Sequence, residues 1–187
     1  KKHAWIQRYK WPIMFFISVA FWNMLGAGVF GFLINPPVAL YYIQGLNTTA
    51  VHSHTALFGV YGMLGMGFIL ICLRIYSKRM WDSKLVKVSF WGLNLGLLLM
   101  VVLSLLPIGI VQAYTSITQG YSFARDSELL YSPTIQTLKW LRMIGDIVFS
   151  VGIVCFCWFT IQETLYCIKQ RPISTQKKTR YAVKLVK

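Results

Sequence analysis

Long apolar blocks alternate along the chain with short segments that hold almost all of its charge. A helix that crosses a bilayer needs about 20 consecutive apolar residues. Blocks of that length are predicted to form spans at residues 13–34, 51–73, 88–112 and 140–162. In lipid only helices and closed barrels satisfy the backbone. The expected fold is therefore all-α, a polytopic transmembrane helical bundle with four spans, in which residues 1–187 form a single membrane-embedded region.

The net charge of +14 is distributed according to these blocks. Basic residues precede the first block, fill the second connection and follow the fourth block, whereas the first connection is uncharged and the third is nearly balanced. Because cytoplasmic loops carry an excess of Lys and Arg, both termini are expected to be cytoplasmic, with residues 168–187 as a basic cytoplasmic tail. A nucleic-acid site would need the cations on one folded face. The expected partner is the lipid bilayer, and no nucleic acid is expected.

A glycine motif in the first block matches the dinucleotide fingerprint G-x-G-x-x-G at Gly26–Gly31. That fingerprint needs a preceding strand and an acidic residue about 20 positions later, but the first acid in the chain is Asp82. Close packing of helices through small residues explains the motif better. We expect the same role for Gly59, Gly62 and Gly65 in the second block, beside a flat ligand if one binds there.

The second block begins VHSHTALFGVYG, which places His52 and His54 two residues apart. Histidines inside a membrane are functional-site candidates by default. At 3.6 residues per turn their side chains diverge by about 200°, so they leave opposite faces of one helix and cannot easily share a metal. Each can instead bind a different iron, and neutral imidazole is a standard axial ligand of haem. We therefore favour two haems, one on each side of the helix, over a structural pair.

Zinc or copper transport is a competing use of membrane histidines. It would need further Cys, His, Asp or Glu ligands in the other spans, where only Asp146 and the cysteines are available. A haem-free transporter or assembly subunit also stays open as an alternative function.

Several long segments are similar to one known family. They are AFWNMLGAGVFGFLINPP, YYIQGLNTTAVHSHTALFGVYGMLG, ARDSE and WLRMIGDIVFSVG. These segments resemble the large subunit of bacterial nitric oxide reductases, which belong to the haem-copper oxidase superfamily, and the likeness covers essentially the whole chain. NPPVALYYIQGLNTT looks more like the single-chain, quinol-dependent form than the cytochrome c-dependent form, which remains the alternative.

The resemblance implies an enzyme of the bacterial inner membrane that serves respiration and denitrification. The family couples two nitric oxide molecules with two electrons and two protons to give N2O and water, and in this form the electrons come from quinol. Matched to the family's H-x-H helix, His52 would be the catalytic axial ligand of the high-spin haem b3. His54 would be an axial ligand of the low-spin haem b.

One family feature has no counterpart in this sequence. The non-haem iron of the family is bound by three histidines and a glutamate from earlier helices, and the only other histidine here is His3. The resemblance therefore implies a C-terminal part of a larger haem-copper oxidase-like fold, inactive alone, whose partners include the remaining upstream spans of the same enzyme.

Two further ionisable positions lie in the fourth block. Arg142 and Asp146 are four residues apart, a spacing at which ion pairs form readily on a helix. We expect a structural ion pair here, with contact between Arg142 and a haem propionate as the alternative. Glu163 lies at the inner end of the same block, where we expect a solvated helix end, with a role in a proton path as the alternative.

Overall fold

The computed structural model describes the backbone of residues 4–81 and 84–185, and the side chains of residues 5–81 and 84–170. Nearly all of this chain is helical, and the described residues contain no strand. Four helical runs are long and apolar enough to cross a membrane: Lys10–Ile34, Asn47–Tyr76, Lys84–Thr118 and Pro133–Gln170. The prediction of an all-α bundle with four spans is therefore confirmed, and the chain is a multi-pass membrane protein. We call these runs the first to fourth spans.

The first span ends where its sequence predicts. It follows α1 (Ala4–Arg8) and comprises α2 (Lys10–Trp22), the π-helical segment η1 (Asn23–Phe30) and α3 (Gly31–Ile34). Pro36 has an extended backbone with ψ of 136°, and a proline lacks the N–H that would continue the helix. The chain then forms α4 (Pro37–Ile43) and turns at Gly45, whose φ of 74° favours glycine.

The second and third spans each contain a π-helical segment between two α-helices. The second span comprises α5 (Asn47–Ser53), η2 (His54–Gly62) and α6 (Met63–Tyr76). The third span comprises α7 (Lys84–Met100), η3 (Val101–Leu105) and α8 (Leu106–Thr118). Two short helices follow, η4 (Phe123–Arg125) and α9 (Ser127–Leu130), and the fourth span is part of α10 (Pro133–Leu185).

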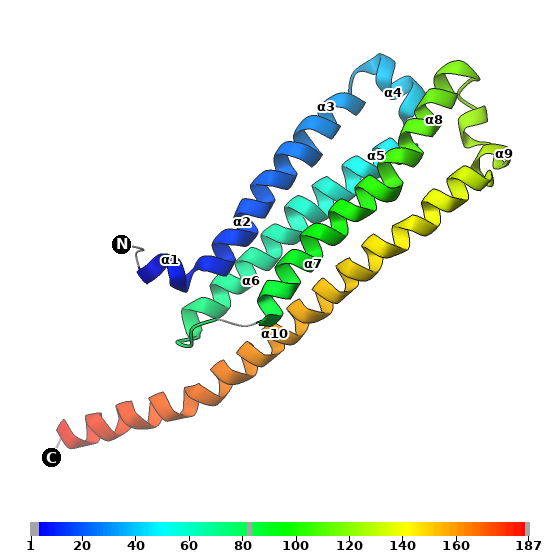
Figure 1. The fold of residues 1–187 in the computed structure, drawn as a ribbon. Helices are drawn as coiled ribbons and strands as arrows, with labels where there is room; N and C mark the ends of the chain where they lie inside the picture. The colour runs from blue at the N-terminus through cyan, green and yellow to red at the C-terminus, as the bar shows by residue number, and fades with distance from the viewer. Residues whose placement is uncertain (1–3, 82–83, 186–187) are drawn as a thin grey trace.

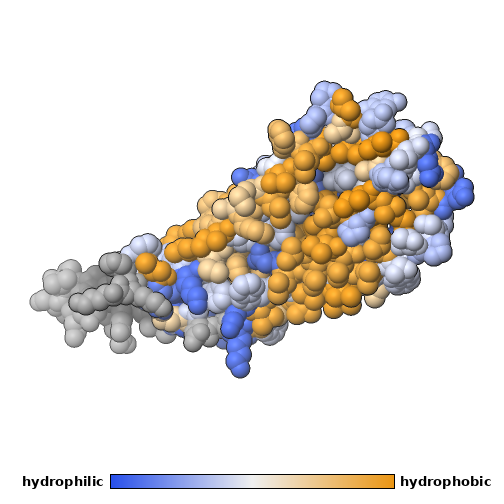
Figure 2. Space-filling model, turned by 45° about the horizontal axis from the view of Figure 1, so that its top comes forward, coloured by the Kyte–Doolittle hydropathy of each residue, from blue (hydrophilic) through white to orange (hydrophobic). Residues whose placement is uncertain are grey.

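The four spans lie side by side in chain order (Figure 1), so that each packs mainly against its neighbours in sequence. On the face shown in Figure 2, apolar side chains cover most of the middle of the bundle, and hydrophilic residues are more frequent towards its two ends. This is the surface expected of a bundle whose solvent is lipid, because lipid-facing positions have no reason to be polar.

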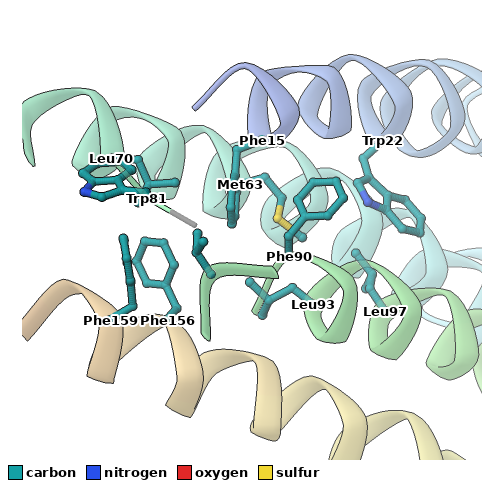
Figure 3. Packing of buried hydrophobic residues seen from close by; sticks show 11 residues of the cluster. Phe15, Trp22, Met63, Leu70, Trp81, Phe90, Leu93, Leu97, Phe156 and Phe159 are labelled. Carbon is teal, nitrogen blue, oxygen red and sulfur yellow. The ribbon is translucent and has the colours of Figure 1, made fainter. Parts of the chain in front are cut away.

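Two apolar clusters fill the interior. The larger one joins all four spans and the connection before α7 (Figure 3), and includes the fully buried side chains of Phe15, Met63 and Leu93. The smaller one surrounds Val51, next to the histidine pair, and includes Leu105 of the third span. The second span is therefore held by apolar contacts near both of its ends.

Glycines let the third and fourth spans approach each other closely. A Cβ added at Gly96 would lie 2.5 Å from the backbone N of Phe149, and one added at Gly145 would lie 2.6 Å from the N of Met100. Real Cβ atoms do not approach backbone so closely. Association of helices in lipid relies on such packing, since there is little hydrophobic drive between them.

The third connection lies against the end of the bundle. Ala124 of η4 is fully buried, and the guanidinium of Arg125 donates to the carbonyl oxygen of Gln44 in the first connection. The two connections therefore form one layer over the end where the histidine pair lies.

Candidate functional site

His52 and His54 point to opposite sides of the second span. His52 is in the last turn of α5 and faces the first span, where a Cβ added at Gly31 would lie 3.1 Å from its Cε1. His54 is the first residue of η2 and faces the fourth span, with its Nε2 at 3.3 Å from Nη2 of Arg142. The structure thus places the two imidazoles on different faces, in agreement with the divergence expected from helical geometry.

The ring of His52 is oriented by a backbone carbonyl of the first span. Its Nδ1 lies 2.8 Å from the carbonyl oxygen of Gly26. Because a carbonyl oxygen only accepts, the neutral ring carries its proton on Nδ1 and leaves the lone pair of Nε2 available to a ligand. The same oxygen also accepts the backbone N–H of Gly31, so η1 fixes its position. Hydrogen bonds of this kind, from the ring N–H to a carbonyl oxygen, set the tautomer and orientation of metal-binding histidines.

A groove of about 380 Å³ opens beside His52, between the first and second spans. Small and apolar side chains form much of its wall, together with one amide, one imidazole and two hydroxyl groups. The lining residues are Asn23, Ala27, His52, Ser53, Ala56, Leu57, Val60 and Tyr61. The groove therefore has the composition expected for a flat, largely apolar ligand next to an imidazole.

The glycines near this groove have different roles. A Cβ at Gly26 would lie 2.6 Å from Thr55, and a Cβ at Gly59 would lie 2.6 Å from Trp22, so both hold the first two spans together. At Gly62 the nearest side chain is Phe58 of the same helix, and at Gly65 nothing lies within 4 Å. The expectation of close helix packing is therefore confirmed for Gly26 and Gly59 and wrong for Gly65, which faces open space.

His54 has the same tautomer as His52, fixed by different partners. Its Nδ1 lies 2.8 Å from the carbonyl oxygen of Ala50, one turn earlier in the same helix. A guanidinium can only donate, so Nε2 of His54 accepts from Arg142 and must be unprotonated. Arg142 thus occupies the position in front of the lone pair of His54.

The predicted ion pair between Arg142 and Asp146 is present. Nε of Arg142 lies 3.3 Å from Oδ1 of Asp146, and the two side chains are 38% and 44% exposed. An i,i+4 pair of this exposure contributes about 0.3–0.5 kcal/mol in water. The pair is therefore weak as a stabilising contact, and it leaves the Arg142 side chain free to move.

Two of the three π-helical segments in the described residues occur at the histidine pair. η1 provides the carbonyl that binds His52, and η2 begins at His54. π-helical turns are rare and are frequent at functional sites. Nothing in the sequence signals η1 or η2, because their bonding pattern depends on the packing of the two spans against each other.

No multi-ligand metal cage lies within the described part of the chain. Among those residues no group of three or more His, Cys, Asp or Glu side chains is placed to hold a metal ion. His3 lies outside the described residues. Each of the two imidazoles can therefore serve as one ligand of a metal whose other ligands come from a cofactor or from other segments.

A second polar centre, at the opposite end of the bundle, was not expected. The carboxylate of Glu163 is fully buried and accepts hydrogen bonds from Arg79 at 2.7 Å, and from Ser77 and the indole N–H of Trp81 at 3.0 Å. The prediction of a solvated helix end is wrong here, because the connection between α6 and α7 folds over α10 and covers the carboxylate. The donors are visible in the sequence, but nothing there pairs them with Glu163.

Four membrane spans, with two imidazoles on opposite faces of the second one, define a helical multi-pass membrane protein. The family model described as cytochrome c and quinol oxidase polypeptide I matches residues 2–148. A nitric oxide reductase subunit from Stutzerimonas stutzeri is 30% identical over 152 residues, which are 79% of this chain and 30% of that protein. The chain belongs to the polypeptide I family of haem-copper oxidases. It spans about 30% of the length of this relative.

Proposed function

We propose that this chain is part of a nitric oxide reductase and that its histidine pair binds two haem irons on opposite sides of one helix. The observation that carries the proposal is the shared tautomer of the two rings. Each Nδ1 lies 2.8 Å from a backbone carbonyl oxygen, so each Nε2 carries the lone pair that could bind a metal, and in His54 that lone pair accepts a hydrogen bond from Arg142. Similarity to a protein named as part of a nitric oxide reductase supports the same function.

The residues around each ring are compatible with a haem to different degrees. On the side of His52 the apolar groove of about 380 Å³ adjoins the ring and can accept part of a flat macrocycle. On the side of His54 the guanidinium of Arg142 lies 3.3 Å from Nε2, the atom that would bind an iron. Haem binding there requires Arg142 to swing aside, which its long, 38% exposed side chain can do.

In this proposal His52 would hold the high-spin haem b3 and His54 would hold the low-spin haem b. The two haems, together with a non-haem iron, would supply the redox chemistry that reduces nitric oxide to N2O. The chain's own residues orient the ligands: the carbonyl of Gly26 keeps the proton of His52 on Nδ1, and that of Ala50 does the same for His54. Such bonds also raise the basicity of the ligand nitrogen.

Arg142 is proposed to bind a propionate of the haem at His54. It is the only cation hydrogen-bonded to either imidazole among the described residues. When displaced from Nε2 it would remain at the edge of the same site, where a carboxylate is its natural partner. Asp146 would then hold the guanidinium from the other side.

The wider setting is also part of the proposal. Electrons would come from quinol, as the resemblance of the NPPVALYYIQGLNTT segment suggests. The enzyme would lie in the bacterial inner membrane with residues 1 and 187 on the cytoplasmic side, as the distribution of basic residues indicates. The ligands of the non-haem iron would come from spans other than these four, so this part of the enzyme would be inactive alone.

Optical spectra of the full-length enzyme test the haem assignment. His52→Ala should remove the carbon monoxide-reactive high-spin signal, and His54→Ala should remove the low-spin signal. Thr164→Ala is the matched control, because the exposed Thr164 hydroxyl donates to the carbonyl oxygen of Thr160 in its own helix near the other end of the bundle, and both signals should persist. If neither histidine substitution changed the high-spin or the low-spin signal, the assignment would be refuted.

Two other assays separate the alternatives. A pyridine haemochrome assay on the purified full-length protein should show two haems b, whereas a transporter or assembly subunit would contain none. Steady-state nitric oxide consumption with quinol and with reduced cytochrome c as donors distinguishes the quinol-dependent enzyme from the cytochrome c-dependent one.

A further inference from the structure

One end of the bundle gathers basic residues from segments that are far apart in the sequence. The guanidinium of Arg74 is buried there and donates through Nε to the carbonyl oxygen of Arg8 at 2.6 Å. The indole N–H of Trp11 donates to the carbonyl oxygen of Trp81 at 3.2 Å. These two bonds fasten the start of the first span to the end of the second span and to the connection that follows it.

The cations brought together in this way are all exposed. We call them the basic rim; its members are Arg8, Lys10, Lys78, Arg79, Lys84 and Lys87. The distribution of charge along the sequence predicts only that these residues share one side of the membrane. The hydrogen bonds of Arg74 and Trp11 additionally place them around one end of a single packed bundle.

One cation of the rim, Arg79, is paired with a buried acid. Glu163 is fully buried, and its Oε1 accepts a hydrogen bond from Nη2 of Arg79 at 2.7 Å. The Arg79 side chain nevertheless stays 52% exposed. Asp82 lies outside the described residues. Among the described residues of this end, the outward face therefore carries positive charge without an exposed carboxylate.

Apolar side chains are exposed beside these cations. Trp5 is 60% exposed, Tyr76 64% and Met80 58%. Aromatic rings with a polar edge and basic groups above an apolar band are typical of the headgroup level of a bilayer. A soluble acidic partner would contact the cations and leave the apolar side chains exposed. A phospholipid can contact both, because it has a phosphate group and acyl chains.

We propose that the basic rim binds the phosphate groups of anionic phospholipids and retains them around this end of the bundle. The proposal is independent of the haem assignment. Each Lys or Arg at an anionic membrane surface adds to the attraction, and the attraction between exposed charges weakens as salt increases. Glu163 has a supporting role, because its burial keeps negative charge away from the lipid phosphates.

Native mass spectrometry of the full-length protein tests this binding. The protein in mild detergent is titrated with equal amounts of phosphatidylglycerol and phosphatidylcholine, and bound lipids are counted. The wild type should retain phosphatidylglycerol preferentially. Lys10→Gln combined with Lys78→Gln should reduce that preference by about fivefold for each cation removed at low salt. Lys139→Gln, at an exposed lysine of the opposite end that donates to the carbonyl oxygen of Leu130, is the matched control and should behave as wild type.

Three outcomes would overturn the proposal. These are equal retention of the two lipids by the wild type, an equal loss in the Lys139→Gln control, and a preference that does not fall with added salt. Thermal unfolding of each variant in the same detergent shows that any loss of lipid is not a loss of fold.

Discussion

The Nε2 atom of His54 lies 3.3 Å from Nη2 of Arg142, a residue 88 positions later in the chain. The fourth span thus closes the face of the second span that carries His54, while the first span closes the face that carries His52. One helix therefore separates two sites with different surroundings. His52 adjoins backbone and small side chains, and His54 adjoins a cation.

Replacing Arg142 should affect the site of His54 alone. In the full-length enzyme, Arg142→Ala should lower the midpoint potential of the low-spin haem by some tens of millivolts, since a nearby positive charge favours the reduced form. The high-spin haem should be unaffected in spectrum. Redox titration followed optically measures both.

The loss of the ion pair with Asp146 must be separated from the loss of the charge. Asp146→Asn is the control, because it removes the ion pair and keeps the guanidinium; it should cost about 0.5 kcal/mol or less. A potential that stays unchanged in Arg142→Ala while stability falls would show that Arg142 has only a structural role.

Gly31→Ala should disturb His52 without removing it. The added Cβ would lie 3.1 Å from Cε1 of the imidazole, so the ring must shift by a few tenths of an ångström. We expect a changed high-spin haem spectrum and a largely unchanged low-spin one. Gly28→Ala is the matched control in the same helix, since its nearest atom is the Asn23 carbonyl oxygen at 3.5 Å. If Gly31→Ala and Gly28→Ala gave the same high-spin spectrum, the proposed effect of the position of the His52 ring on this haem would be contradicted.

Gly96→Ala should separate the third and fourth spans. Its Cβ would lie 2.5 Å from backbone of Phe149, which cannot move aside as a side chain can, and overpacking of this kind costs about 1–3 kcal/mol. Gly65→Ala is the control, because nothing lies within 4 Å of its Cβ; it should be neutral or stabilising by up to about 1 kcal/mol, the helix penalty of glycine. Thermal unfolding in mild detergent compares the two. Equal unfolding temperatures would mean that the close approach of these helices is not required.

Glu163→Ala should destabilise the protein by about 1–3 kcal/mol, because the buried donors of Ser77 and Trp81 lose their acceptor. Glu163→Gln keeps one acceptor oxygen and should cost less. Glu128→Ala, at an exposed position in α9, should change stability by no more than about 0.5 kcal/mol. Denaturant or thermal unfolding of the three variants measures this order. Full stability of Glu163→Ala would show that the connection is held to α10 by packing alone.

Much of the fold could be predicted because lipid leaves few choices. A charge-free run of about 20 residues must form a helix there, and Pro36 must end the first one. The divergence of His52 and His54 follows from helical geometry alone, so the two-sided arrangement was predictable as well. The i,i+4 pair of Arg142 and Asp146 was predictable for the same reason, since both residues lie on one helix.

The partners of these residues were not predictable, because they depend on which helices meet. No local pattern links Gly26 to His52, Arg142 to His54 or Glu163 to Trp81. Glu163 shows this most clearly: its place at the polar end of a span predicts a solvated residue, and only the folded connection buries it. Gly65 shows the converse, since it matches a packing pattern but faces open space.

The sequence by itself determined the four spans, the ends where their charges lie and the opposite directions of the two imidazoles, because each of these depends on hydropathy or on the geometry of a single helix. The tertiary structure decided what each imidazole meets, where the π-helical segments form and why Glu163 is buried. Those features depend on contacts between segments many residues apart, and only packing of the spans against one another brings such segments together.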